Sequence, residues 1–215
     1  MTIEKVEEAQ PMDSEESHLS PNEKLLNDIR TQRLVSGALL AGLSIAVSPI
    51  AALIPRIPGW GIAFFDPVSI FWIIGLLLGG PYVGAICITA GTLGLFFFDP
   101  TGIGPMFKFL ATLPLMVMAY LAVKTKKPSE GRALSRPELY GVAMIAGYLI
   151  RLAIMIPLNL LIIPILMPFL TVNPGWEVYI IEYVLIINTT TSIFDAIVPF
   201  VVVHRTPLFE NFRMW

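Results

Sequence analysis

The chain has few of the residues that carry catalysis, metal binding or cross-linking. Its 215 residues include one cysteine and two histidines, and only 14% are Asp, Glu, Lys or Arg. The single Cys87 excludes an internal disulfide framework. His18 and His204 have no partners at ligand spacing, so no metal site is predicted. We expect neither a metal nor a cofactor.

Sequence motifs of common enzymes are also missing. There is no G-x-x-x-x-G-K-[ST] nucleotide loop and no H-E-x-x-H pair. Gly102-Ile103-Gly104 is not followed by an aspartate, which argues against an intramembrane aspartyl protease. No basic patch with interleaved aromatic residues indicates a nucleic-acid partner. We therefore predict no catalytic residues, and no enzyme.

Long apolar runs dominate what is present. Hydrophobic residues make up 55% of the chain, and the mean hydropathy is +0.75, too apolar for a soluble domain of this length. A membrane-spanning helix needs about 20 mostly apolar residues. The sequence predicts an all-α integral membrane protein, a bundle of six transmembrane helices. The expected spans are residues 34–54, 67–78, 82–98, 106–123, 139–170 and 178–203. Gly79-Gly80-Pro81 joins the two short spans, which could form a tight helical hairpin or be partly re-entrant.

Charge divides the chain into three parts and orients it. Residues 1–30 are predicted to be a disordered acidic cytoplasmic tail, residues 31–205 the six-helix membrane domain, and residues 206–215 a short cytoplasmic tail. Basic residues mark the cytoplasmic side, and six spans place both termini together. The residues that set this orientation are Arg30, Arg33, Lys124, Lys126, Lys127, Arg132, Arg136, Arg205 and Arg213.

The tetrapeptide Phe-Phe-Asp-Pro occurs twice, at residues 64–67 and 97–100. With this orientation both copies lie at the outer face. Proline suits the first turn of a helix, so Pro67 is expected to begin a span. Asp99 is expected to cap a helix or to pair with Lys108, and Asp66 is the better candidate to close over a ligand.

Two opposite charges are expected deep in the membrane. Arg151 lies about 20 Å along the fifth span and Asp195 about 12–15 Å from the inner end of the sixth, at 1.5 Å per residue. A long arginine can bridge that difference, so we predict a buried Arg151–Asp195 ion pair. We favour a structural lock over a transport role.

Other polar side chains gather in the outer half of the predicted bundle. Asn188, Thr191 and Asp195 share one helical face by their spacing, and Asn159 is two turns outward of Arg151. An outward-facing pocket for a small polar molecule follows. Its predicted substrate-binding residues are Asn159, Asn188, Asp66, Lys108, Phe65 and Thr191, with Phe64, Phe97 and Tyr183 as further aromatic lining. The alternative is that Lys108, Asp66 and Asp99 only reach the interface or cap helices.

Small residues recur at helical spacing in the first span. Ala38, Gly42 and Ala46 form one ridge, with Gly37 and Ala41 beside it. Such ridges let membrane helices approach closely. They serve either packing inside the bundle or docking of a partner membrane protein.

Taken in order, these segments resemble one transporter family. The residues 65–68 (Phe-Asp-Pro-Val), 79–84 (Gly-Gly-Pro-Tyr-Val-Gly) and 99–112, with Arg151, Met155, Asn159, Pro164 and Asn188, resemble the substrate-binding S component of energy-coupling factor (ECF) vitamin transporters, most of all the riboflavin type. The resemblance covers about residues 32–205.

The resemblance implies a prokaryotic plasma-membrane subunit that captures a vitamin from outside. Its partners would be a transmembrane coupling protein, docked on Ala38, Gly42 and Ala46, and two cytoplasmic ATPases. Asn159 and Asn188 would hydrogen-bond the ligand ring, with riboflavin as transported ligand rather than cofactor. Where riboflavin-type members often carry a lysine this chain has Thr191, which leaves a related flavin or another heterocycle open.

Two other kinds of function compete with this interpretation. An autonomous ion-coupled secondary transporter would use Asp195, Arg151 and Glu182 as a relay. A purely structural bundle would bind no ligand, and the clustered outer polar residues argue against it.

Overall fold

The computed structural model describes residues 20–51, 67–99, 101–125, 131–166, 168–212 and 215. These residues form helices and turns and contain no β-strand. The helices are α1 (Pro21–Ala51), α2 (Pro67–Leu95), α3 (Ile103–Lys124), η3 (Gly131–Ser135), α4 (Pro137–Leu166), η4 (Pro168–Thr171), α5 (Trp176–His204) and α6 (Leu208–Phe212). Five of them, α1 to α5, are long and apolar enough to cross a membrane. The chain is an all-α protein of the multi-pass membrane class, as the sequence predicts.

Helix α2 is a hairpin of two arms that lie side by side. Gly80 interrupts it with φ 78° and ψ −168°, a conformation that glycine adopts readily. Across the hairpin, a Cβ on Gly84 would lie 3.0 Å from Cβ of Leu76, and one on Gly75 would meet the sulfur of Cys87. The predicted spans 67–78 and 82–98 are therefore two antiparallel arms. Each arm is about 20 Å long at 1.5 Å per residue.

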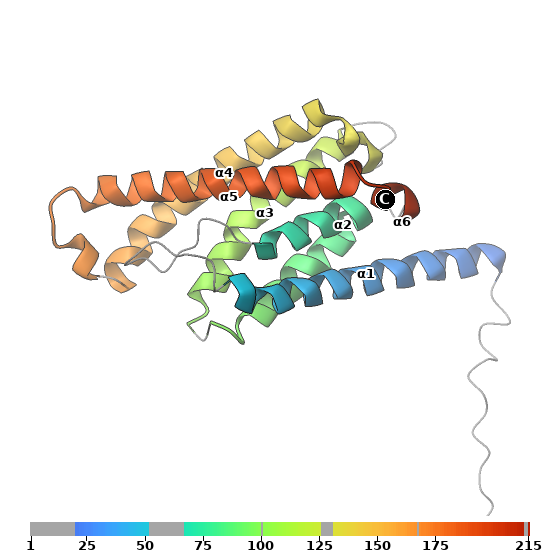
Figure 1. The fold of residues 1–215 in the computed structure, drawn as a ribbon, viewed down its shortest axis with the longest axis horizontal. Coiled ribbons are helices and arrows are strands. Elements are labelled where there is room, and N and C mark those ends of the chain that lie inside the picture. Colours follow the sequence, from blue (N-terminus) through green and yellow to red (C-terminus); the bar gives the residue numbers. More distant parts are fainter. Residues whose placement is uncertain (1–19, 52–66, 100, 126–130, 167, 213–214) are drawn as a thin grey trace, which may run out of the picture.

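This hairpin is the centre of the bundle. Most of α2 is buried, including the fully enclosed Trp72, Ile73 and Leu77. It contacts α1, α3 and α5, while α3 packs on α4 and α4 on α5 (Figure 1). Because glycines alternate with large aliphatic residues along it, the two arms can approach closely and still fill the core. Cys87 is a core residue, as expected for a lone apolar thiol.

Helix α1 begins earlier than the sequence predicts. Residues 21–30, expected to belong to the disordered tail, form its first turns. Ser20, Pro21 and Glu23 stand at the positions that favour a helix start, and the N–H of Lys24 donates to the carbonyl of Ser20 at 3.0 Å. The first part of α1 extends beyond the other helices (Figure 1).

The C-terminal segment is packed rather than loose. The sequence predicts a short tail over residues 206–215, but α6 contacts both α5 and α2. Leu208, Phe209 and Trp215 lie against the main hydrophobic core. A Cβ on Gly80 would lie 2.7 Å from the Trp215 ring. Apolar residues therefore hold this segment on the hairpin turn.

Helix α4 ends at Leu166, before the predicted end of the fifth span at residue 170. Pro168 begins η4, and the residue before a proline is disfavoured in a helix. The chain then turns into α5 through Gly175, whose φ of 87° again suits glycine.

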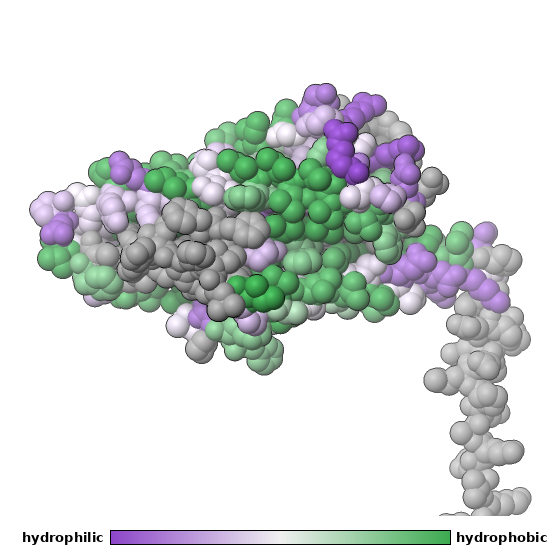
Figure 2. Space-filling view, in the orientation of Figure 1, coloured by the Kyte–Doolittle hydropathy of each residue, from purple (hydrophilic) through white to green (hydrophobic). Residues whose placement is uncertain are grey.

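The outer surface of the bundle is apolar over its middle. Figure 2 shows hydrophobic residues across the central part and hydrophilic ones gathered mainly at one end. That end holds the start of α1, the α3–α4 connection and the C-terminus (Figure 1). The large apolar side chains exposed on α4 and α5 include Val142, Ile145, Leu161, Ile165, Ile186, Ile193 and Ile197. An apolar surface with polar ends is what a lipid environment requires.

The close approach of the hairpin arms gives a test with two glycines. In Gly91→Ala, the added Cβ would collide with Nε1 of the Trp72 ring and lie 2.9 Å from Ser44 Oγ, where Trp72 Nε1 donates to Ser44 at 3.0 Å. We expect a loss of about 1–3 kcal/mol from overpacking. The unfolding midpoint in detergent should fall by roughly 2–4 °C per kcal/mol.

Gly141→Ala is the matched control. Nothing lies within 4 Å of the Cβ position of Gly141 outside its own helix, so this change should stabilise by about 0.4–1 kcal/mol. Equal midpoints for the two variants would contradict the tight hairpin.

Candidate functional site

Arg151 is the centre of a buried polar network. It is the only charged residue of α4 beyond the first turn, and its residue surface is 5% exposed. Its Nε donates to Oδ1 of Asn188 at 2.7 Å, and one terminal nitrogen donates to the hydroxyl of Thr191 at 2.7 Å. The other donates to Oδ2 of Asp195 at 3.1 Å, which is also an ion pair. The two charges expected to pair therefore lie together.

The spacing on α5 explains how one side chain reaches three partners. Asn188, Thr191 and Asp195 are three and seven residues apart and lie on one helical face. The planar guanidinium presents its N–H groups in a fixed fork. It can therefore contact two turns of α5 at once, and it fixes the register of α4 against α5.

The hairpin joins the same network through a serine. Ser69 Oγ donates to the second carboxylate oxygen of Asp195 at 2.6 Å, and Ser69 is 4% exposed. This residue is not among the predicted site residues. A signal for it was present in the sequence, because Ser69 is the only hydroxyl-bearing residue in the arm 67–79. The network thus ties α2, α4 and α5 together.

The remaining polar atoms of the network bond to their own helix. The amide nitrogen of Asn188 donates to the carbonyl of Val184 at 2.8 Å. The Thr191 hydroxyl donates to the carbonyl of Ile187 at 2.8 Å. Opposite charges cancel and their hydrogen bonds are made, which is the condition for keeping ions in an apolar interior. Asn188 and Thr191, predicted to contact a ligand, are in this structure partners of Arg151.

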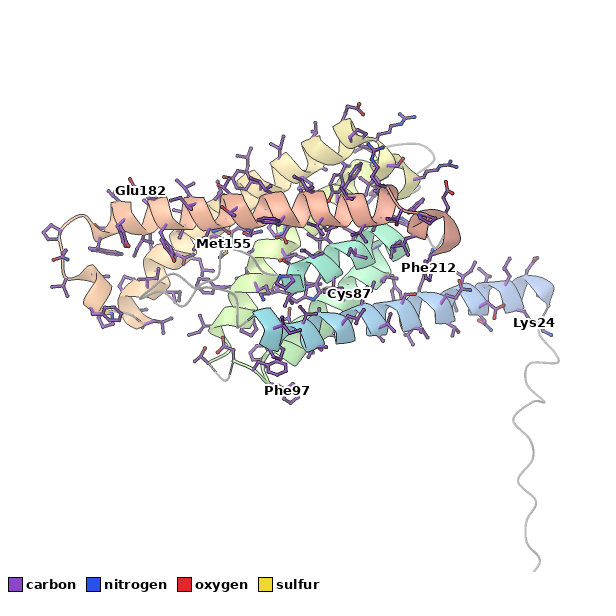
Figure 3. All side chains as sticks on the ribbon, viewed as in Figure 1. Lys24, Cys87, Phe97, Met155, Glu182 and Phe212 are labelled. Carbon is purple, nitrogen blue, oxygen red and sulfur yellow. The ribbon has the colours of Figure 1, made fainter. Side chains whose placement is uncertain are left out.

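Asn159 lies in a different environment, two turns along α4 from Arg151. It is 6% exposed, and its amide nitrogen donates to the carbonyl of Met155 at 2.7 Å. Around it α3, α4 and α5 form a second apolar cluster, in which Met155 is labelled in Figure 3. Its buried members are Ala111, Met155, Ile163, Ile180, Tyr183, Val184 and Ile187, with Phe107 and Trp176 partly buried beside them.

The other predicted pocket residues are not brought together in the same way. Phe65 and Asp66, like Phe64, lie outside the described residues. Lys108 lies on α3, partly buried, one residue after the Phe107 that borders the second cluster. Phe97 is expected to line the pocket, but it is 88% exposed and points away from the bundle (Figure 3). Its place in a tight turn after α2 directs it outward.

Asp99 caps the start of α3. Its Oδ1 accepts from the hydroxyl and the N–H of Thr101 at 2.5 and 3.0 Å, and its Oδ2 accepts from the N–H of Gly104 at 3.0 Å. The Thr101 hydroxyl foremost, and then the backbone N–H groups, hold the pKa of this carboxyl below its ordinary value. Capping is one of the two roles expected for Asp99.

The small-residue ridge of α1 faces outward. Ala38, Gly42 and Ala46 are exposed, and nothing lies within 4 Å of the Cβ position of Gly42. Gly37 and Ala41 are buried instead, with a Gly37 Cβ lying 3.0 Å from Ile86 of α2. Among the described residues, internal packing therefore uses the neighbouring set and leaves the ridge exposed.

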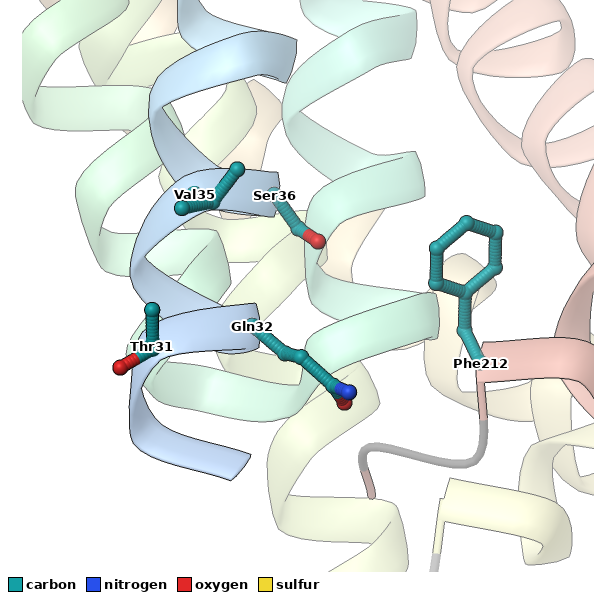
Figure 4. A pocket seen from close by; sticks show the side chains of 5 residues that line it. All are labelled: Thr31, Gln32, Val35, Ser36 and Phe212. Carbon is teal, nitrogen blue, oxygen red and sulfur yellow. The ribbon is translucent and has the colours of Figure 1, made fainter. Parts of the chain in front are cut away.

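Two cavities lie at the end of the bundle that carries the basic residues. The first, about 380 Å³, is bordered by α1 and by Phe212 of α6 (Figure 4). The second, about 360 Å³, lies beside the hairpin turn of α2. Neither is lined by Asn159 or Asn188. Within the described part of the chain, no group of three His, Cys, Asp or Glu residues is placed to hold a metal.

Comparison of the chain with protein-family models, curated proteins and solved structures gave no match.

Removing one charge of the Arg151–Asp195 pair should cost more than removing both. Arg151→Met leaves Asp195 buried without its cation, and Asp195→Asn leaves the cation without its anion; either should cost about 3–5 kcal/mol. The double variant should recover much of that loss, measured as the unfolding midpoint in detergent. Glu182→Gln, at an exposed position on the same helix, is the control and should have no effect. Additive single losses would show that the pair is not coupled.

The cap at Asp99 predicts a pH-dependent difference. A carboxyl whose pKa is lowered by folding stabilises the fold at any pH above its unfolded-state pKa, which is near 3.9 in model peptides. This contribution is lost as the pH falls through the lower folded-state pKa. At neutral pH, Asp99→Asn should lower the free energy of unfolding by about 1 kcal/mol, the usual cost of losing a cap, and this is measured as a lower unfolding midpoint. The gap from wild type should close in acid. Glu177→Gln, an exposed first-turn acid of α5, controls for general charge effects, and a gap that persists in acid would argue against the cap.

Proposed function

We propose that this chain is a membrane-embedded binding subunit for uptake of a small heterocyclic vitamin. In this proposal it works like the S component of ECF transporters, and riboflavin or a related flavin is its ligand. The supporting sequence pattern runs from the hairpin 67–95 through Asn159 to Asn188. The chain has no nucleotide loop of its own, so the ATPases would be partner chains.

The proposed topology counts each arm of the α2 hairpin as one crossing, giving six. The two arms are short against a hydrocarbon core of about 30 Å, so local thinning of the bilayer accompanies this arrangement. The end of α3, the start of α4 and the end of α5 lie together with the C-terminus (Figure 1). Lys124 ends α3, Arg132 and Arg136 precede α4, and Arg205 follows α5. The positive-inside rule assigns that end to the cytoplasm, here of a prokaryotic cell.

The observation that carries the proposal is the position of Asn159. It is a buried amide on the face of α4 that carries Met155 and Ile163, one helical turn from each, and these two belong to an apolar cluster of three helices. It also lies in the half of α4 away from the basic end, and hence in the outer half of the bundle in this topology. An amide offers a donor and an acceptor to the polar edge of a heterocycle, while the apolar cluster accepts its ring face. The segment around Asp66 would close this site from outside.

The uncovered ridge supports the dependence on a partner. Ala38, Gly42 and Ala46 lie on the face of α1 that the bundle does not use. A coupling protein docked there would connect the bundle to ATPases and drive its reorientation, with release of the ligand inside.

The buried ion pair favours one alternative, an autonomous ion-coupled carrier. In that mechanism Asp195 and Glu182 would carry the coupled proton or cation, and Arg151 would act in the relay as a fixed positive charge. Glu182 is exposed on α5 and projects from the bundle (Figure 3). A relay would therefore have to connect this surface position with the buried Arg151–Asp195 pair. Transport by the purified chain alone, in liposomes with an ion gradient, would favour the carrier.

A flavin titration tests the binding proposal. The purified protein should quench flavin fluorescence at micromolar concentration. Asn159→Ala should weaken the affinity by roughly 10-fold or more, because a buried hydrogen-bond partner of the ligand is lost.

Asn173→Ala, at an exposed position between η4 and α5, is the matched control and should bind like wild type. If the wild type quenches no flavin, riboflavin is not the ligand. If Asn159→Ala binds unchanged, the site lies elsewhere.

A further inference from the structure

We propose that the cavity beside the α2 hairpin turn binds the phosphate group of an anionic phospholipid of the inner leaflet. Residues from α1, α2 and α3 and from the C-terminus line it, and its volume is about 360 Å³. The vitamin proposal assigns no role to it. The inference rests on the membrane location of the chain and its orientation, and does not depend on vitamin binding.

The charge of the lining selects an anion. Arg33 of α1 and Lys124 of α3 both border the cavity, and none of its described lining side chains is acidic. Two tyrosines, Tyr82 and Tyr120, add hydroxyl groups as further hydrogen-bond donors. Basic pockets between membrane helices on the cytoplasmic side are suited to anionic headgroups.

The position of the cavity matches the membrane interface. Tyr82, Tyr120 and Trp215 all border it, and tyrosine and tryptophan are enriched at the headgroup level. The cavity lies at the basic end of the bundle, next to the hairpin turn at Gly79 and Pro81. A soluble phosphate compound has the same group, so the source must be separated by experiment.

A largely apolar stripe continues from the cavity along the second arm of α2. Tyr82, Ala85, Thr89 and Leu93 are exposed at helical spacing, with Tyr82 54% and Leu93 62% exposed. None of the four is charged. From Tyr82 to Leu93 the stripe runs about 16 Å at 1.5 Å per residue, roughly half of a 30 Å hydrocarbon core. That is the length available to an acyl chain in one leaflet. A headgroup cavity followed by such a stripe favours a phospholipid over a free phosphate.

The test titrates phosphatidylglycerol into the detergent-solubilised protein and counts bound lipid by native mass spectrometry. Wild type should bind one phosphatidylglycerol at least 10-fold more tightly than phosphatidylcholine. Arg33→Gln with Lys124→Gln should weaken phosphatidylglycerol binding by roughly 10- to 30-fold, as expected for two cations near an anionic lipid. Tyr120→Phe, which removes one hydroxyl from the lining, should weaken it by roughly 3-fold and keeps the test valid if the double variant does not fold.

The control is Arg132→Gln with Arg136→Gln, an equal charge change at exposed positions of the same end and outside the cavity lining. It should bind like wild type. Equal binding of phosphatidylcholine would show an interfacial belt without selectivity. An equal loss in the control pair would show diffuse attraction. Displacement of the lipid by glycerol phosphate at similar concentration would assign the cavity to a soluble anion. Any of these results would overturn the proposal.

Discussion

The guanidinium of Arg151 constrains the whole bundle because its charge lies in an apolar interior. It needs acceptors on several sides, and α5 supplies them only where Asn188, Thr191 and Asp195 face α4. A shift of one residue along α5 would rotate this face by about 100° and leave a buried ion unpaired. Asp195 in turn holds Ser69 of the hairpin. The position of α2, on which α1 and α6 pack, therefore depends on the same contact.

This network separates two parts of the interior with different properties. Near the middle of α4 and α5 the polar atoms of Arg151, Asn188 and Thr191 are engaged within the protein, so displacing them for a ligand would require breaking charge-assisted bonds. Further along α4, away from the basic end, Asn159 has one backbone bond, from its amide nitrogen, and lies one helical turn from both Met155 and Ile163 of the second apolar cluster. Its acceptor oxygen can be used without disturbing the ion pair. An ion-pair network in the middle of the bundle and an apolar cluster beyond it fit the binding proposal, in which one part of the bundle binds the ligand and the other holds its shape.

Residue patterns were sufficient to predict the features that depend on apolar length and on position along a helix. Apolar length predicts α3, α4 and α5 to within a few residues, and depth along two helices predicts that Arg151 and Asp195 meet. The hydrogen bonds of Asn188 and Thr191 to Arg151 were harder to predict, because spacing shows a shared face but not which neighbour uses it. The start of α1 and the docking of α6 were not predicted. The helix begins at Ser20-Pro21 in spite of the charge of residues 21–30, and α6 packs on α2 in spite of the short length of 206–215. The prediction that Phe97 lines the pocket was wrong for a similar reason, because a repeated tetrapeptide does not determine the direction of a side chain in a turn.

The short hairpin also explains why the two ends of the bundle differ. Its arms are about 20 Å long, so they fall short of a hydrocarbon core of about 30 Å. When the ends at Pro67 and Leu95 lie near one interface, the turn at Gly80 does not reach the other. Polar headgroups or protein side chains must then descend to this level to solvate the turn. Trp215 covers part of it, and Arg33 and Lys124 border the rest. A basic, aromatic hollow at this point is thus a consequence of using a hairpin where longer helices would have filled the space.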